Sequence, residues 1–128
     1  MTKFRELDYH LSVGAILKDK QGNYVLDNSN GLFAFMTGTV EDDEPLETCL
    51  HRELMEEFGM TCGILQFSGV STVTVSDKTR SMFRKSIIWF ECILTHEGFP
   101  NAECKDIVRL KELPVDNRDH GRWPAHLK

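Results

Sequence analysis

The sequence lacks the features that mark several large classes of protein. No apolar run approaches the ~18 residues of a membrane-spanning helix, and the N-terminal stretch MTKFRELDYH has no apolar core of a secretory signal peptide. Basic residues number 15 against 20 acidic ones, giving a net charge of -5, which argues against binding to nucleic acid or to an anionic membrane surface. We therefore expect a cytoplasmic protein with neither partner.

Cysteine and histidine are also used sparingly. The four cysteines form no CxxC pair and are too few for a disulfide scaffold, so we expect reduced thiols. The five histidines have no metal-ligand spacing, which argues against a zinc site.

The composition suits one ordinary domain. With 128 residues and 41% hydrophobic content, residues 1–128 can bury a core as a single unit, and no repeat is visible. Much of the chain reads as strand. We expect strands at 9–17 and 23–26 joined as a hairpin, one at 32–36, a second hairpin of 64–75 and 82–94, and a short strand at 106–110, followed by a helical turn at 111–113.

One helix is predicted more clearly than any other element. Pro45 suits a helix start, because its missing N–H costs nothing there, and Gly59 suits the position just past the end. Apolar residues recur every four positions between them, at Leu46, Leu50, Leu54 and Phe58. The sequence therefore predicts a helix over 45–58 with one side packed on the sheet.

A second side of this helix carries three carboxylates. Glu53, Glu56 and Glu57 stand at i, i+3 and i+4, so they share one face. Like charges at this spacing repel, and a cation is expected opposite them. Mg²⁺ takes oxygen ligands and is commonly completed by substrate phosphates. Arg52 lies four residues before Glu56, where it could pair with a carboxylate and fix its direction.

The same run resembles a known signature. The pattern G-x5-E-x7-R-E-U-x-E-E-x-G-U, with U a bulky aliphatic residue, is met at every fixed position from Gly38 to Met60. This is the pattern of the Nudix hydrolases. The resemblance implies the Nudix fold, an α/β (α+β) arrangement with a mixed β-sheet sandwiched between helices. It also implies Mg²⁺-dependent, or possible Mn²⁺-dependent, hydrolysis of a phosphoanhydride in a nucleoside diphosphate linked to another group.

The resemblance assigns roles to residues inside the signature. Glu56 and Glu57 would be the principal metal ligands, and Glu53 either a further ligand or the base that activates water. Arg52 would orient a glutamate, and Glu44 would share that network. Gly59 has a structural role at the helix end.

Further metal ligands come from outside the helix. Relatives bind the metal through a backbone carbonyl before the helix, here that of Thr37 or Gly38, although this chain reads Met-Thr-Gly where many have Pro-Gly-Gly. Relatives often add an acidic ligand from a loop after the second hairpin. Glu103 is the candidate, with Glu97 the alternative.

The substrate is less constrained by the sequence. The basic residue that relatives often place after the second strand is absent, since the chain reads Asp27-Asn28 there. Candidate phosphate contacts lie in the second hairpin, at Arg80, Arg84 and Lys85. Candidate base contacts are Phe35 and Trp123, with Phe33, Phe83 and His126.

The markers of the ADP-ribose and dinucleoside polyphosphate subgroups are missing, which favours a nucleoside triphosphate or similar small nucleotide. The other hypothesis is a non-catalytic Nudix-like module that senses a nucleotide. Family members are often dimers, and the sequence leaves monomer or homodimer open.

Overall fold

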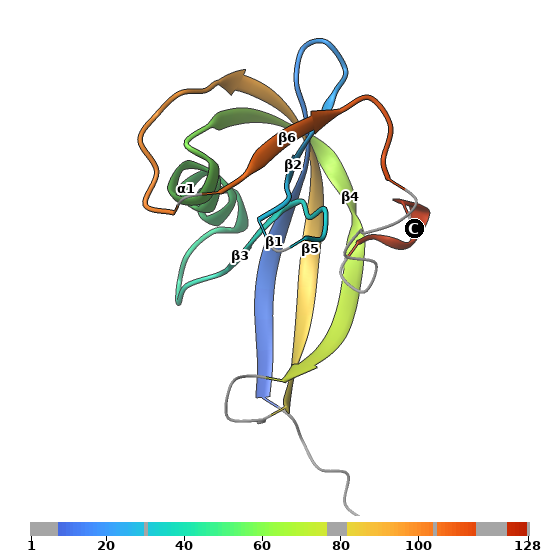
Figure 1. Ribbon diagram of the computed structural model, residues 1–128. Coiled ribbons are helices and arrows are strands. Elements are labelled where there is room, and N and C mark those ends of the chain that lie inside the picture. The colour runs from blue at the N-terminus through green and yellow to red at the C-terminus, as the bar shows by residue number, and fades with distance from the viewer. Residues whose placement is uncertain (1–7, 30, 77–81, 104, 115–122, 128) are drawn as a thin grey trace, which may run out of the picture.

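The computed structural model describes residues 8–29, 31–76, 82–103, 105–114 and 123–127. In chain order the elements are β1 (Asp8–Lys18), β2 (Tyr24–Asp27), β3 (Met36–Thr39), α1 (Leu46–Phe58), β4 (Thr61–Ser76), β5 (Met82–His96), β6 (Ile107–Leu110) and a 3-10 turn, η1 (Ala125–Leu127). In Figure 1, β1, β5 and β4 are long strands that run on past α1, which lies to one side of them.

The strands form one mixed sheet in the order β4-β5-β1-β2-β6, with β3 also paired to β1. β1 and β5 run parallel, and the other pairs are antiparallel. Two neighbouring pairs matter for the site. β3 pairs Gly38 with Val13 at the middle of β1, and β6 pairs Ile107 with Asp27 at the end of β2. Both pairs bring loops to the same side of the sheet as α1.

The predicted fold class and most predicted elements are confirmed. Both hairpins form, and α1 ends at Gly59, whose φ of 64° is left-handed. Pro45 is the N-cap residue, one place before the first helical residue. The strand predicted at 32–36 is instead β3 at Met36–Thr39, because that segment is the one that pairs with β1. The predicted helical turn at 111–113 is a bend, since Pro114 disfavours helical backbone before it.

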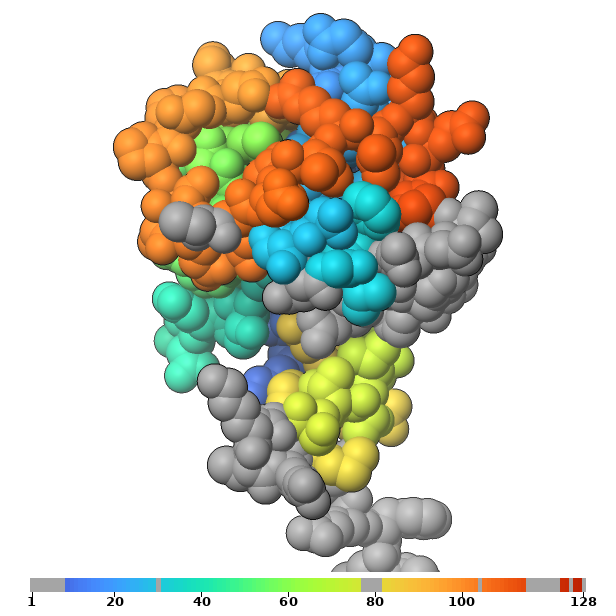
Figure 2. Space-filling model, viewed as in Figure 1, coloured from blue at the N-terminus to red at the C-terminus, as the bar shows by residue number. Residues whose placement is uncertain are grey.

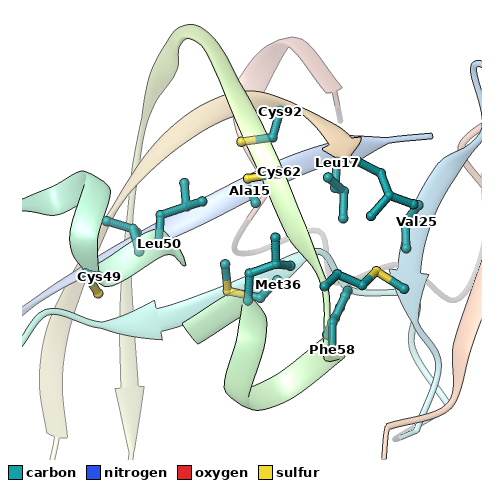
Figure 3. Close-up of a cluster of buried hydrophobic side chains, with 13 residues drawn as sticks. Ala15, Leu17, Val25, Met36, Cys49, Leu50, Phe58, Cys62 and Cys92 are labelled. Atoms are coloured by element: carbon teal, nitrogen blue, oxygen red, sulfur yellow. The ribbon is translucent and has the colours of Figure 1, made fainter. Parts of the chain in front are cut away.

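One core cluster lies between α1 and the sheet. Cys49, Leu50, Leu54 and Phe58 are the buried residues of the helix, which confirms its predicted apolar side except that Leu46 is half-buried. They pack against alternate residues of β1, namely Val13, Ala15 and Leu17. Figure 3 shows Leu50 and Phe58 directed from the helix toward Ala15 and Leu17. Burying these side chains stabilises the helix in one orientation. The other faces of the helix stay outside this core cluster.

A second core cluster covers the opposite face of the sheet. Trp89 of β5 contacts Phe35 edge-on at 6.0 Å, and Phe35 contacts Trp123 at 4.9 Å. This face is therefore closed in part by η1 and the residues before it, whereas α1 is the one α-helix among the described residues. No helix in the described part of the chain has the length and apolar character to cross a membrane.

Candidate active site

The middle of α1 lies close to β3 because Gly38 has no side chain. A Cβ atom added at Gly38 would stand 2.2 Å from Cγ of Glu53 and 2.4 Å from its Cδ. Gly38 does not have positive φ, so its contribution is space rather than an unusual backbone. Glu53 thus lies directly over the strand backbone, where its side chain is 15% exposed. The first glycine of the signature is explained by this close approach.

Arg52 gathers three of the signature glutamates. Its Nε and Nη2 donate to the two carboxylate oxygens of Glu44, at 2.7 and 2.9 Å. Its Nη1 donates to Glu53 at 2.9 Å and to Glu56 at 3.2 Å, and its Nη2 reaches the Thr39 carbonyl at 3.3 Å. The fork-shaped guanidinium therefore fixes two carboxylates of the helix and the loop before it at once.

This ion pairing changes the pKa values of the partners. The hydrogen bond from Arg52 lowers the pKa of Glu44 to about 2, against the opposing effect of burial. The hydrogen bonds to Glu44 and Glu53 in turn raise the pKa of Arg52. Both groups are therefore charged at physiological pH. Arg52 and Glu44 are therefore paired, and their role in orienting a metal-binding glutamate stays a prediction.

Glu57, on the same helix face, lies near a different cation. Its Oε1 lies 3.6 Å from Nζ of Lys105, which is also 3.1 Å from Glu103 and 3.7 Å from Asp27. These four residues come from the end of α1, the end of β2 and the segment leading into β6. The carboxylates thus form two groups around separate positive charges, and each group includes residues of α1. The Arg52 group contains Glu44, Glu53 and Glu56, and the Lys105 group contains Glu57, Glu103 and Asp27.

Glu57 is the least satisfied carboxylate of the site. Its side chain is 14% exposed, and its Oε2 is buried with no hydrogen-bond partner among the described residues. Burial raises the pKa of Glu57 to about 7, although the charge of Lys105 opposes that rise, and Glu53 and Glu103 add to it. A carboxylate in this condition costs free energy unless a cation approaches it.

The segment that carries Glu103 is tied to the end of α1. Ala102 donates its backbone N–H to the carbonyl of Glu56 at 3.0 Å, and Phe99 donates to that of Gly59 at 3.1 Å. A Cβ at Gly59 would stand 2.2 Å from the Phe99 carbonyl oxygen, so glycine is needed for space as well as for φ. Figure 2 shows the surface of this segment, in orange, adjoining that of the β2–β3 region, in blue and cyan.

The donor set fits a hard divalent cation. Its members are carboxylate and backbone oxygens, which Mg²⁺ and Mn²⁺ prefer, and the partnerless Oε2 of Glu57 is an open acceptor among them. Among the described residues no three His, Cys, Asp or Glu side chains already converge on one point. Glu53 and Glu56 are turned toward Arg52, and Glu57 is turned toward Lys105.

The predicted site residues outside the helix have different outcomes. Thr37 does not have positive φ, so threonine is unstrained at this position, where many relatives have glycine. Glu103 and Glu57 both lie near Lys105, and the role of Glu103 as an added acidic ligand stays a prediction. The alternative, Glu97, is paired instead with Arg109 at 2.5 Å.

The candidate substrate contacts are less well placed. Arg84 is exposed near the start of β5, opposite Tyr9, and beyond the part of β1 that pairs with β3. Arg80 lies outside the described residues. Phe35 and Trp123 are 3% and 1% exposed and pack on each other in the second core cluster, as aromatic residues at strand positions usually do.

Sequence reasoning missed Lys105 and the site role of Asp27. Asp27 was read as the absence of a basic residue after the second strand, yet its carboxylate is buried and bonded to Ser29. A basic residue, Lys105, instead comes from the segment just before β6, which pairs with β2. The available signal was the run Glu103-Cys-Lys105 shortly before the short strand predicted at 106–110, but the strand with which it pairs could not be read from the sequence.

A cavity of about 380 Å³ lies elsewhere, between the β1–β2 turn, β4, β5 and η1. Its lining includes His126, one of the candidate base contacts, together with Lys18 and Tyr24. None of its lining residues belongs to α1 or to the two carboxylate groups. The cavity is therefore separate from the site built on the helix.

Comparison with known proteins agrees with this geometry. A MutT protein from Methanosarcina mazei Go1 superposes with a TM-score of 0.71 at 22% identity, over 92% of this chain and 90% of that one. A NUDIX hydrolase from Nitrosomonas europaea superposes with a TM-score of 0.67 at 19% identity, over 91% of this chain and 65% of that one. A further NUDIX hydrolase from the same organism gives 0.65 at 12% identity, over 94% and 96%.

At these low identities, the TM-scores of the superpositions show a shared fold. None of the curated proteins matches the chain. The sequence profile of the NUDIX domain, however, matches residues 8–127, which is nearly the whole chain and includes both carboxylate groups. With the signature residues placed on one helix over β3, this match shows that the chain belongs to the Nudix family.

Proposed function

We propose that this protein is a Mg²⁺-dependent Nudix hydrolase that cleaves a phosphoanhydride bond in a nucleoside diphosphate linked to another group. A nucleoside triphosphate or a similar small nucleotide is the proposed substrate. Mn²⁺ is the proposed substitute metal.

The partnerless carboxylate oxygen of Glu57 carries this proposal. A buried acceptor with a raised pKa costs stability, and packing alone does not explain it. It lies on the helix that also presents Glu53 and Glu56. The backbone of β3 is close to this helix, at Gly38 and at the Thr39 carbonyl. Hard oxygen donors held at one place support a divalent cation as the missing partner.

Each residue has a role that follows from its contacts. Glu56 and Glu57 would hold the cation with a backbone carbonyl of Thr37 or Gly38, and Glu103 would add a carboxylate from its loop. Glu53 is held rigidly by Arg52 over the β3 backbone, which suits either a further ligand or the base that takes a proton from water. A divalent ion bound there would neutralise phosphate oxygens and lower the pKa of a bound water.

The proposal is tested by Glu57→Gln, assayed for phosphate or pyrophosphate release from a nucleotide panel with Mg²⁺. We expect kcat to fall on the order of 10²- to 10⁴-fold, the range that losing a catalytic base or a preorganised charge costs. The melting temperature should not fall, because the variant removes a desolvated carboxylate. Turnover in ¹⁸O-labelled water then identifies which phosphorus is attacked.

Glu47→Gln is the matched control, since Glu47 is an exposed glutamate in the first turn of the same helix. Its turnover should equal that of the native protein. Full turnover in Glu57→Gln would remove Glu57 from the site. Nucleotide binding without any hydrolysis by the native protein would instead favour the sensor hypothesis.

A further inference from the structure

Lys105 occupies the side of Glu57 that faces the β2–β6 edge. Its Nζ has three carboxylates within 3.1 to 3.7 Å, from Glu103, Glu57 and Asp27. The side chain is 20% exposed, so it is partly shielded from water. Burial alone would lower the pKa of Lys105, but Glu103, Glu57 and Asp27 together leave it raised.

The backbone that follows this lysine is anchored to the end of β2. Asp106, the next residue, accepts a hydrogen bond from Asn28 at 2.9 Å and donates to the Ser29 hydroxyl at 2.8 Å. β6 then continues in register along β2. The ammonium therefore reaches Glu57 from an anchored position, unlike a lysine on a free loop.

The three distances distinguish this contact from an ordinary ion pair. The contacts of Lys105 with Glu57 and Asp27 exceed hydrogen-bond length, and Oε2 of Glu57 is left without a partner. The ammonium supplies positive charge but does not satisfy the carboxylate. A small divalent ion could satisfy it, and would then meet the like charge of Lys105 nearby.

We propose that Lys105 is a positioning residue. Its ammonium attracts the Glu57 carboxylate in the metal-free protein, and a divalent ion that binds Glu57 must compete with this ammonium. The lysine would offset part of the negative charge of Glu57, Glu103 and Asp27 without metal and weaken the affinity for the ion. The inference rests on the proposed function only in taking Glu57 as a metal ligand. Hydrolysis itself is not assumed.

The test is a titration of the substrate-free protein with Mn²⁺, in which free Mn²⁺ is measured by its electron paramagnetic resonance signal. Lys105→Met keeps the length and apolar character of the side chain and removes the charge. We expect it to bind Mn²⁺ about fivefold more tightly, as loss of one positive charge several ångströms from the ion implies. Lys105→Arg keeps the charge and should bind close to the native affinity.

Lys111→Met is the matched control, because Lys111 is exposed just beyond β6 and should leave Mn²⁺ binding unchanged. Circular dichroism establishes that each variant is folded, and Lys105→Gln replaces Lys105→Met if the latter is not. Unchanged or weaker Mn²⁺ binding in the folded, uncharged variant would overturn the inference, because a purely structural lysine predicts that result.

The two proposals can fail separately. If the native protein binds Mn²⁺ at Glu57 and Lys105→Met tightens it, the inference holds even when no nucleotide is hydrolysed. If hydrolysis depends on metal but the uncharged variant shows no tightening, the inference alone fails. Glu57→Gln in the same titration reports whether the ion uses Glu57 at all, and native-like Mn²⁺ affinity in that variant would overturn the inference too.

Discussion

The Arg52 group and the Lys105 group of carboxylates differ in how many hydrogen bonds their cations make to them. Arg52 makes four hydrogen bonds of 2.7 to 3.2 Å to Glu44, Glu53 and Glu56. Lys105 stands 3.1 to 3.7 Å from its three carboxylates and leaves an oxygen of Glu57 bare. The carboxylates near Arg52 are thus hydrogen-bonded to their cation, whereas Glu57, on the same helix face, has a bare oxygen.

The pKa values follow the same division. The Arg52 hydrogen bond holds the pKa of Glu44 at about 2, whereas burial brings that of Glu57 to about 7. A group with saturated hydrogen bonds is suited to fixing geometry, and an underpaired one is suited to binding something further. We therefore interpret the Arg52 group as the support of the site and the Lys105 group as its binding side.

The largest effect should come from breaking the support. Arg52→Gln leaves the Glu44 and Glu53 side chains, 10% and 15% exposed, without their charged partner. We expect the free energy of unfolding to fall by about 2 to 4 kcal/mol and kcat to fall about 10- to 100-fold. Urea unfolding and steady-state kinetics measure the two. Lys105→Met is the comparison and should lose about 1 kcal/mol or less, because its contacts are longer. Equal losses in both variants would abolish the distinction.

A pH series sharpens the comparison at Glu44. Its pKa in the folded protein is lowered from 4.5 to about 2, so its pairing stabilises the fold above the unfolded-state value. That contribution is lost as the pH falls from 4.5 toward 2. Glu44→Gln should therefore be less stable than the native protein at about pH 7, with the difference shrinking by about pH 3. Urea unfolding of both proteins at each pH checks this, and a constant difference would contradict it.

The smallest effect is expected on the binding side, at its most exposed member. The Glu103 side chain is 51% exposed, so Glu103→Gln should change stability by about 0.5 kcal/mol or less. It should weaken Mn²⁺ binding about two- to fivefold by removing one nearby charge. Glu97→Gln is the control, because Glu97 is exposed to a similar degree but pairs with Arg109. A larger effect on Mn²⁺ binding in Glu97→Gln would reverse the choice between the two glutamates.

Local rules account for the residues that the sequence placed correctly. Glu53, Glu56 and Glu57 lie on one helix face because the helix repeat requires it, and Gly59 ends the helix because its backbone is left-handed. The apolar positions of α1 were readable for the same reason. The strand before the helix was displaced by a few residues, since β3 is defined by its pairing with β1 and not by local propensity.

Contacts between distant segments account for what was missed. Phe35 and Trp123 are separated by 88 positions, and their mutual burial depends on how the tail returns to the sheet. Lys105 meets Glu57 only because β6 adds to the edge of β2. Neither the period of a helix nor the composition of a loop carries that information.

The sequence by itself determined the family, the helix α1 and the acidic face that it presents, because each of these depends on residues of one helix and the loop just before it. The tertiary structure alone decided how those carboxylates divide. Arg52 pairs with Glu44, Glu53 and Glu56, while strand pairing between β2 and β6 places Lys105 near Glu57. The physical reason is that charge pairing depends on distance in space, and strands far apart in the chain set that distance only after they pair.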